Sequence, residues 1–137
     1  MSGTVVLVVD VLNSYEHPDA DLLIPNVEPI IDPLSQLLKR AHDTDDVEMM
    51  TKVRHSAFYS TPLGYLLGRL GTERVVITGQ VTEQCILYTA LDAYVRHFDV
   101  VLPPDAVAHI DAELGTAALK MMEQNMAATL LPAAECI

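Results

Sequence analysis

The chain has 137 residues, a formal net charge of −11 at pH 7 and a hydrophobic content of 50%. These values suit one globular domain with a single core and argue against a disordered chain. Its eight Lys and Arg residues are spread along the chain in ones and twos, so neither nucleic-acid nor membrane-surface binding is expected, because both need a clustered basic face. The sequence shows no membrane-span run, no signal-peptide layout and too few cysteines for a disulfide framework. We therefore expect a cytoplasmic domain over residues 1–137.

The first predicted element is a strand. The stretch "TVVLVVDV" (4–11) is β-branched or apolar at every position until Asp10, which is typical of a strand buried on both faces in a parallel sheet. "EHPDAD" (16–21) is interpreted as a solvated turn. A helix is predicted next, because one apolar face follows the i, i+3, i+4, i+7 spacing. Its residues are Leu34, Leu37, Leu38 and Ala41.

The middle of the chain predicts a further strand and a second helix. "VEMMTK" (47–52) indicates a strand that ends in a lysine. In "TPLGYLLGRLG" (61–71), Thr61 can cap a helix, Pro62 fits its first turn and Gly71 can end it. The apolar stripe of this helix is expected to be Leu63, Leu66, Leu67 and Leu70.

The C-terminal half continues to alternate strands with helices. "RVVITG" (74–79), "DVVL" (99–102) and "AATLL" (127–131) predict strands. Helices are predicted from Thr82 to about Phe98 and from Asp111 to about Met126. The second of these is expected to turn three side chains inward, namely Leu114, Ala118 and Met121.

This alternation predicts an α/β fold with three layers, α/β/α. The expected core is a Rossmann-like, doubly wound parallel sheet of five to six strands with helices on both faces. In such sheets ligands bind at the carboxyl ends of the strands, where the strand order reverses. Asp10, the turn at residues 79–82 and Asp105 all follow predicted strands. They are therefore expected along one edge of the sheet.

Cys85 is the first candidate for chemistry. If Thr82 caps the helix that follows "GQVTEQC" (79–85), Cys85 lies in its first turn. There, unpaired backbone N–H groups and the helix dipole stabilise an anion, which lowers the pKa of a thiol and can bind an oxyanion. A small buried hydrophobic residue is the alternative, and position alone leaves both open. Cys136 is interpreted as such a buried residue.

Asp10 and Lys52 are the other candidates. A carboxylate that ends a wholly apolar strand needs a partner or a cleft, although Asp10 to Asn13 also suits an ordinary turn. Lys52 could place a positive charge beside Asp10 and the thiol. Considered without the other candidates, however, Lys52 is interpreted as an ordinary surface lysine.

The sequence predicts no metal centre and no cofactor. The five histidines show no spacing of a zinc site, although His55 is the best candidate for a Cys–His dyad with Cys85. Neither of the glycine-rich phosphate-binding motifs is present.

Taken together, four segments resemble the isochorismatase-like cysteine hydrolases. In order and spacing they match the strand of that family that ends in Asp, its Lys-x-x-x-Ser-Ala-Phe segment, its Thr-Gly-x-x-Thr-x-x-Cys turn and its Asp-Ala-Val. The segments are "VVLVVDVLNSY" (5–15), "KVRHSAFYSTPL" (52–63), "ITGQVTEQCILYTALDAY" (77–94) and "VVLPPDAVA" (100–108). The cysteine segment is the most specific of the four.

The resemblance implies a catalytic triad of Asp10, Lys52 and Cys85, with backbone N–H groups of Val81 and Cys85 as the oxyanion hole. A cysteine at this position favours the amidase-type members, which act on small molecules without a cofactor. The resemblance also implies a cis peptide between Gln80 and Val81, and a homodimer or higher homo-oligomer. The substrate-binding residues that it implies are Asn13, Tyr15, Phe58, Gln80 and Thr82.

One departure from the family pattern is local. The family has a further strand and a long loop after its first helix, where this chain has only "TDDVEMM" (44–50). We therefore expect that a family segment near residues 43–46 is absent. The metal site that nicotinamidases carry in that segment would then be absent as well. Otherwise "VEMMTK" must take the place of the missing strand.

Three functional hypotheses follow. The first is a cysteine-nucleophile hydrolase that cleaves an amide-type C–N bond through an acyl-enzyme. The second is a non-catalytic homologue that acts as a structural or interaction module, which the missing segment favours. A redox-active thiol protein is disfavoured, because no second cysteine near Cys85 could resolve a sulfenic acid.

Overall fold

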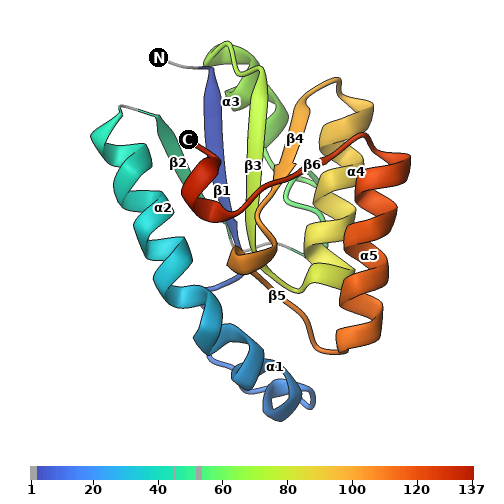
Figure 1. Ribbon diagram of the computed structural model, residues 1–137. Helices are drawn as coiled ribbons and strands as arrows, with labels where there is room; N and C mark the ends of the chain where they lie inside the picture. Colours follow the sequence, from blue (N-terminus) through green and yellow to red (C-terminus); the bar gives the residue numbers. More distant parts are fainter. Residues whose placement is uncertain (1–2, 45, 52–53) are drawn as a thin grey trace.

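The computed structural model describes residues 3–44, 46–51 and 54–137. Strands alternate with helices along the chain, as the sequence predicts (Figure 1). The strands are β1 (Thr4–Val9), β2 (Val47–Thr51), β3 (Arg74–Gln80), β4 (Asp99–Leu102), β5 (Val107–Ala108) and β6 (Thr129–Leu130). The α-helices are α1 (Ala20–Val27), α2 (Ile31–Asp43), α3 (Leu63–Arg69), α4 (Leu87–Val95) and α5 (Ala112–Asn125). None of the helices in the described part of the chain is long and apolar enough to cross a membrane.

The strands form one parallel sheet of six, in the order β2-β1-β3-β4-β6, with β5 paired to the end of β3. From β1 the chain first adds β2 on one side and then β3, β4 and β6 on the other. The strand order therefore reverses between β1 and β3, which are directly paired, with Val9 opposite Gly79. Ligands of doubly wound sheets bind outside the carboxyl ends of two such strands.

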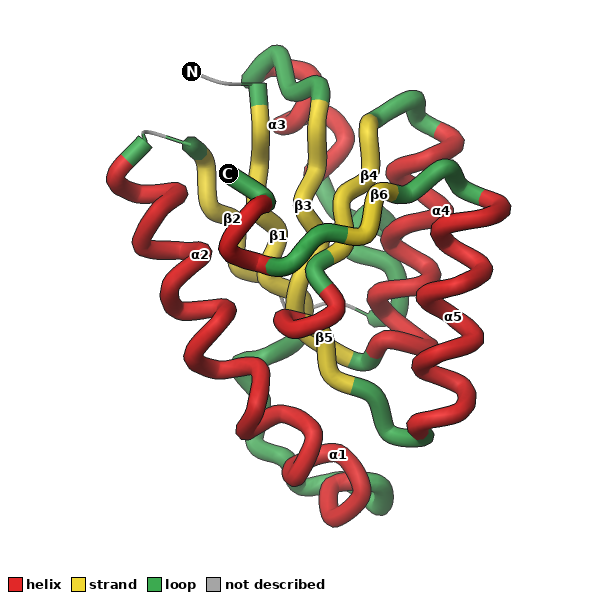
Figure 2. Tube along the Cα trace, viewed as in Figure 1, coloured by secondary structure: helices red, strands yellow, loops and turns green. Residues whose placement is uncertain are grey.

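Helices cover both faces of the sheet, which gives the three predicted layers (Figures 1 and 2). Because side chains of a strand alternate between faces, β1 contributes to two separate cores. Val6 and Val8 pack on α2 and the C-terminal segment, whereas Val5, Leu7 and Val9 pack in the core on the other face, which holds residues of α3, α4 and α5.

Two predicted helical stripes are partly wrong. In α5 the buried residues are Gly115, Ala118 and Met122, whereas Leu114 and Met121 are exposed. Asp111 caps α5 by accepting from Leu114 N–H at 2.9 Å, and the inward face includes Gly115, where a Cβ would lie 2.7 Å from the Cβ of His109. In α3 the buried residues are Leu63 and Leu67, and Leu66 is exposed. That helix ends before Gly71, which has the expected positive φ of 65°.

Helix α1 is not among the helices that the sequence predicts. It follows the turn at residues 17–19 and contains Pro25, a residue that normally argues against a helix interior. Its buried Leu23 and Val27 pack with Val81 and Ala108 in a third, smaller core. Helix α1 therefore lies against the carboxyl-end edge of the sheet (Figure 1).

The segment predicted as "VEMMTK" forms β2 and pairs with β1 in register from Val5–Val47 to Val9–Thr51. It occupies the edge of the described sheet next to β1. The expected absence of a family segment near residues 43–46 stays a prediction, because Asp45 lies outside the described residues.

Gly79 makes the close approach of β1 and β3 possible. Its φ is +109°, and a Cβ at this position would lie 2.1 Å from the Val9 carbonyl oxygen. Only glycine fits such a conformation and such a contact. The peptide that follows, between Gln80 and Val81, is cis.

Candidate functional site

A cavity of about 300 Å³ lies at the carboxyl ends of β1 and β3. The loop after β1, helix α1, the end of β3 and the turn that follows it form its walls, with Ile110 on the α5 side. Cys85 and Asp10 both line it. The two candidate residues, 75 positions apart, therefore meet at the reversal of strand order.

A hydrogen-bond network fixes the backbone of Asp10. Its N–H extends the pairing with β2 by donating to the Thr51 carbonyl at 2.9 Å. Its carbonyl oxygen accepts from Asn13 Nδ2 at 3.0 Å and from Gln80 Nε2 at 2.8 Å. The Tyr15 hydroxyl donates to the Gln80 side-chain oxygen at 3.3 Å or to a nearby carbonyl. Asp10 itself has a φ of 57°, a conformation that aspartate tolerates better than most residues.

Four of the predicted substrate-binding residues differ in whether they line the cavity, and three of them support the Asp10 loop. Asn13 and Gln80 line the cavity, but their side chains also hold the Asp10 loop. Tyr15 is not among the lining residues; it braces the same loop. Phe58 lies in the core, where its ring stacks 6.3 Å from that of Phe98. The structure therefore gives Asn13, Tyr15 and Gln80 a part in building the site, whereas Phe58 belongs to the core.

The prediction that Thr82 caps the helix of Cys85 is wrong. The capping position is Val81, and the segment Thr82–Ile86 is π-helical before α4 begins. Its wider turn is closed by the Ile86 N–H, which donates to the Val81 carbonyl at 3.1 Å. Thr82 is 1% exposed, and its hydroxyl makes no hydrogen bond with the residues that the structure describes. Cys85 nonetheless lies in this first turn, as expected.

The surroundings of the Cys85 thiol favour its protonated form. Burial raises the pKa of the thiol most, and the nearby Asp10 carboxylate raises it further. Hydrogen bonds from backbone N–H groups of Val81, His55 and Cys85 lower the pKa by less. The expected lowering of the thiol pKa is therefore wrong in net direction, because desolvation outweighs the N–H groups. A thiol of this kind needs a base at the moment of attack.

His55 contributes its backbone to the site. It has a φ of 69°, and its backbone N–H is one of the groups that lower the pKa of the Cys85 thiol. Its ring packs edge-on against Tyr88, with the centroids 5.8 Å apart. Next to it, the Ala57 N–H donates to the buried hydroxyl of Thr89 at 3.0 Å, which fastens this loop to α4. Sequence patterns carry no signal for such a backbone donor.

Lys52 lies outside the described residues, so its predicted role stays a prediction. Asp105 was expected at the same edge as Asp10, but it does not line the cavity. Its carboxylate accepts instead from the Ala133 N–H at 2.8 Å and holds the C-terminal segment.

No group of three or more His, Cys, Asp or Glu side chains suited to a metal ion occurs within residues 3–44, 46–51 and 54–137. Glu16, His17 and Asp19 do lie around the mouth of the cavity. All three are exposed and belong to the turn that the sequence placed in solvent.

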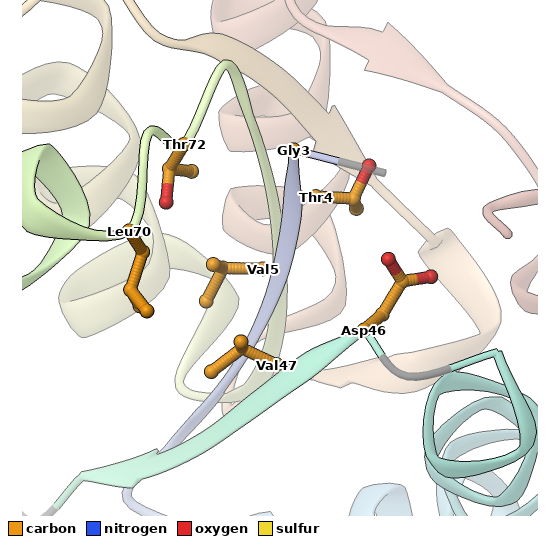
Figure 3. A pocket seen from close by; sticks show the side chains of 7 residues that line it. All are labelled: Gly3, Thr4, Val5, Asp46, Val47, Leu70 and Thr72. Carbon is orange, nitrogen blue, oxygen red and sulfur yellow. The ribbon is translucent and has the colours of Figure 1, made fainter. Parts of the chain in front are cut away.

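A much smaller hollow lies at the opposite, amino-terminal edge of the sheet (Figure 3). It is lined by Thr4 and Val5 of β1, the start of β2 near Asp46, and the segment around Thr72. With about 10 Å³ it holds no more than about one water molecule. The large cavity beside Cys85 is therefore the better candidate for a substrate site.

Known proteins share this sequence pattern. The chain matches the model of the isochorismatase domain over residues 30–135. It is 40% identical over 81 residues to the uncharacterized isochorismatase family protein YaaI of Bacillus subtilis (strain 168), a match that covers 59% of this chain and 45% of that protein. It is 36% identical over 72 residues to nicotinamidase 3 of Arabidopsis thaliana, covering 53% of this chain and 36% of that protein. The chain thus spans less than half the length of these two curated relatives.

The fold is shared with solved structures. The crystal structure of a pyrazinamidase/nicotinamidase from Streptococcus mutans UA159 superposes with a TM-score of 0.83 at 19% sequence identity. The superposition covers 93% of this chain and 99% of that one. At this identity the likeness shows a common architecture.

Proposed function

This chain belongs to the isochorismatase domain family, and from that premise we propose that it is a hydrolase that cleaves an amide-type C–N bond of a small molecule. The nucleophile is Cys85, and the reaction passes through an acyl-enzyme. The observation that carries the proposal is the meeting of Cys85 with Asp10 in one cavity at the reversal of strand order. The nicotinamidase relative and the pyrazinamidase/nicotinamidase structure support an amide as the substrate class.

Acylation begins with a protonated thiol. Since burial and Asp10 hold the pKa of Cys85 above its ordinary range, a free thiolate is scarce at neutral pH. Asp10 therefore takes the thiol proton as the sulfur attacks the carbonyl carbon. The same carboxyl group then returns this proton to the leaving nitrogen when the C–N bond breaks. The product is a thioester on Cys85 and a free amine or ammonia.

The backbone N–H groups around the sulfur stabilise the oxyanion of the tetrahedral intermediate. Val81 and Cys85 are the two donors that the family resemblance implies, and the backbone N–H groups of both lower the pKa of the thiol. Donors fixed by the backbone lose little on binding a developing oxyanion, because they need no reorganisation. We assign Lys52, on the family resemblance, the role of steadying the negative charge of Asp10.

Deacylation reverses the roles. Asp10 accepts a proton from water as the water oxygen attacks the thioester carbonyl. The C–S bond then breaks, and Cys85 regains the proton. The carboxylic acid leaves, and the thiol and Asp10 are restored to their initial protonation states.

A panel of small primary amides, including nicotinamide, pyrazinamide and benzamide, tests the activity through release of ammonia. We expect turnover by the wild type and by Cys136→Ser, and at least about a thousandfold loss in Cys85→Ser. Cys136→Ser is the matched control, since it removes the other buried thiol. Equal turnover by Cys85→Ser and wild type, or no hydrolysis across the panel, would overturn the proposal.

A further inference from the structure

Glu83 joins the turn that carries Cys85 to residues 109–111, the corner that precedes α5. One oxygen of its carboxylate accepts from two backbone N–H groups, those of Ile110 at 2.8 Å and Asp111 at 2.9 Å. Hydrogen bonds to a carboxylate are charge-assisted and are about twice as strong as those between neutral groups. The second oxygen, Oε2, is buried and makes no hydrogen bond with the residues that the structure describes.

The side chain of Glu83 does not face the thiol. Residues two apart on a helical turn point in different directions, and the hydrogen bonds of Glu83 reach the corner, 27 and 28 residues away along the chain. Any effect of Glu83 on the reaction must therefore act through the groups that it holds.

The corner forms part of the substrate cavity. Ile110 lines the cavity, and Asp111 caps α5 by accepting from Leu114 N–H. The corner also packs tightly on α5, since a Cβ on Gly115 would lie 2.7 Å from the Cβ of His109. On its other side, Asn26 Nδ2 of α1 donates to the His109 carbonyl at 2.9 Å. The Ile110 wall is thus held between α1, α5 and the turn of the nucleophile.

We propose that Glu83 is a positioning residue that sets the distance between the Ile110 wall of the cavity and the turn of Cys85. This inference rests on the proposed function, because it assigns the wall to substrate binding. It goes beyond that function in naming a residue that tunes the fit of the substrate without touching it.

The test compares Glu83→Ala and Glu83→Gln with Glu113→Ala in the full chain. Glu113 is an exposed carboxylate in the first turn of α5, so its removal changes the charge near the same corner. With the best amide of the panel, we expect Glu83→Ala to raise KM about tenfold with kcat within about threefold of wild type. Glu83→Gln retains an acceptor oxygen, so its KM should return to within about threefold. Glu113→Ala should match the wild type.

Hydrogen exchange supplies a readout that needs no turnover. The amides of Ile110 and Asp111 should exchange at least about tenfold faster in Glu83→Ala than in wild type or Glu113→Ala. An unchanged KM, an equal rise in KM in Glu113→Ala, a failure of Glu83→Gln to restore it, or unchanged exchange would overturn the proposal. If the wild type hydrolyses no amide, the proposed function fails. Unchanged exchange would instead refute the claim that Glu83 holds the backbone of Ile110 and Asp111, whatever the activity.

Discussion

At the scale of single residues, the site combines a thiol whose pKa is raised with an aspartate whose backbone is fixed by hydrogen bonds. Cys85 is 8% exposed, and its pKa is raised first by burial and then by Asp10. The same carboxylate that suppresses the resting thiolate is the base that we propose for attack. Removing its charge should therefore affect thiol reactivity and hydrolysis in opposite directions.

Asp10→Asn separates these two roles. Without the negative charge, the pKa of Cys85 should fall, so the pH midpoint of alkylation of this residue by iodoacetamide should move to lower pH than in the wild type. Amide hydrolysis should nevertheless drop by at least about a hundredfold, because the base is gone. Peptide mass spectrometry after labelling at a series of pH values measures the first effect. A midpoint that rises in Asp10→Asn would contradict the assigned electrostatics.

Gln80 offers a second test at this scale. It is 1% exposed and uses both ends of its amide, donating to the Asp10 carbonyl and accepting from the Tyr15 hydroxyl. Gln80→Glu removes the donor and buries a carboxylate beside the Asp10 carbonyl, which should lower kcat at least about tenfold. Tyr15→Phe removes only a shared donor and should lower kcat less. Equal activity of Gln80→Glu and wild type would show that the Asp10 loop needs no such support.

The residues of the site differ in how far the sequence could predict them. Asp10 directly follows a buried strand, and Cys85 lies in the most specific of the family-like segments, so pattern and resemblance both reach them. The joint support of Asp10 by Asn13 and Gln80 is a property of three-dimensional packing, because Gln80 is distant in the chain. The π-helical turn, which displaces the expected cap at Thr82, also leaves no periodic signal in five residues.

At the scale of elements, the strands are predicted better than the helix faces. Continuous apolar runs identify buried strands directly, and β4 has the predicted bounds. The inward face of a helix depends on its starting point and its neighbours, so the predictions for Leu114 and Met121 are wrong by about one position each. Helix α1 escapes prediction because Pro25 interrupts its pattern.

Gly79→Ala tests the pairing of the two central strands. A Cβ placed 2.1 Å from the Val9 carbonyl, at a φ of +109°, must push β1 away from β3 or twist the turn of the nucleophile. We expect a loss of at least about 3 kcal/mol in the free energy of unfolding, or failure to fold. Urea unfolding followed by circular dichroism measures it.

Gly68→Ala is the matched control for this substitution. Gly68 is an exposed glycine within α3, and a Cβ added to it would meet no other atom within 4 Å. Alanine there should stabilise the protein by up to about 1 kcal/mol through helix propensity. A Gly79→Ala variant as stable as Gly68→Ala would show that the strands tolerate the side chain.

At the scale of the whole molecule, the doubly wound sheet explains why two short segments build the site. The alternation of strands and helices is enough to predict three layers and a site at the carboxyl edge. The exact neighbours of β1 are not predictable from pattern alone, because strand order is fixed by packing. Here β2 and β3 flank β1 and bring Asp10 beside the Cys85 turn.

Cys136, in the C-terminal segment, should make the free energy of unfolding depend on pH above about pH 9. Burial first, and Asp105 second, raise the pKa of Cys136 to about 11 from an ordinary value of 9.0. Between these values the unfolded chain has lost the proton and the folded protein keeps it, so stability falls as pH rises. In Cys136→Ser this part of the decline should disappear. The check is the difference in free energy of unfolding between the two proteins from pH 8 to about pH 11; a constant difference would contradict the assignment.

The central claim is that Cys85 carries the acyl group during turnover. The most direct measurement is the intact mass of the protein, quenched in acid during steady-state hydrolysis of its best amide, followed by peptide mapping. We predict an added mass equal to the acyl part of the substrate, located on Cys85 and absent from Cys85→Ser, while Cys136 stays unmodified. Full turnover by Cys85→Ser, or an adduct on any other residue in its place, would contradict the account.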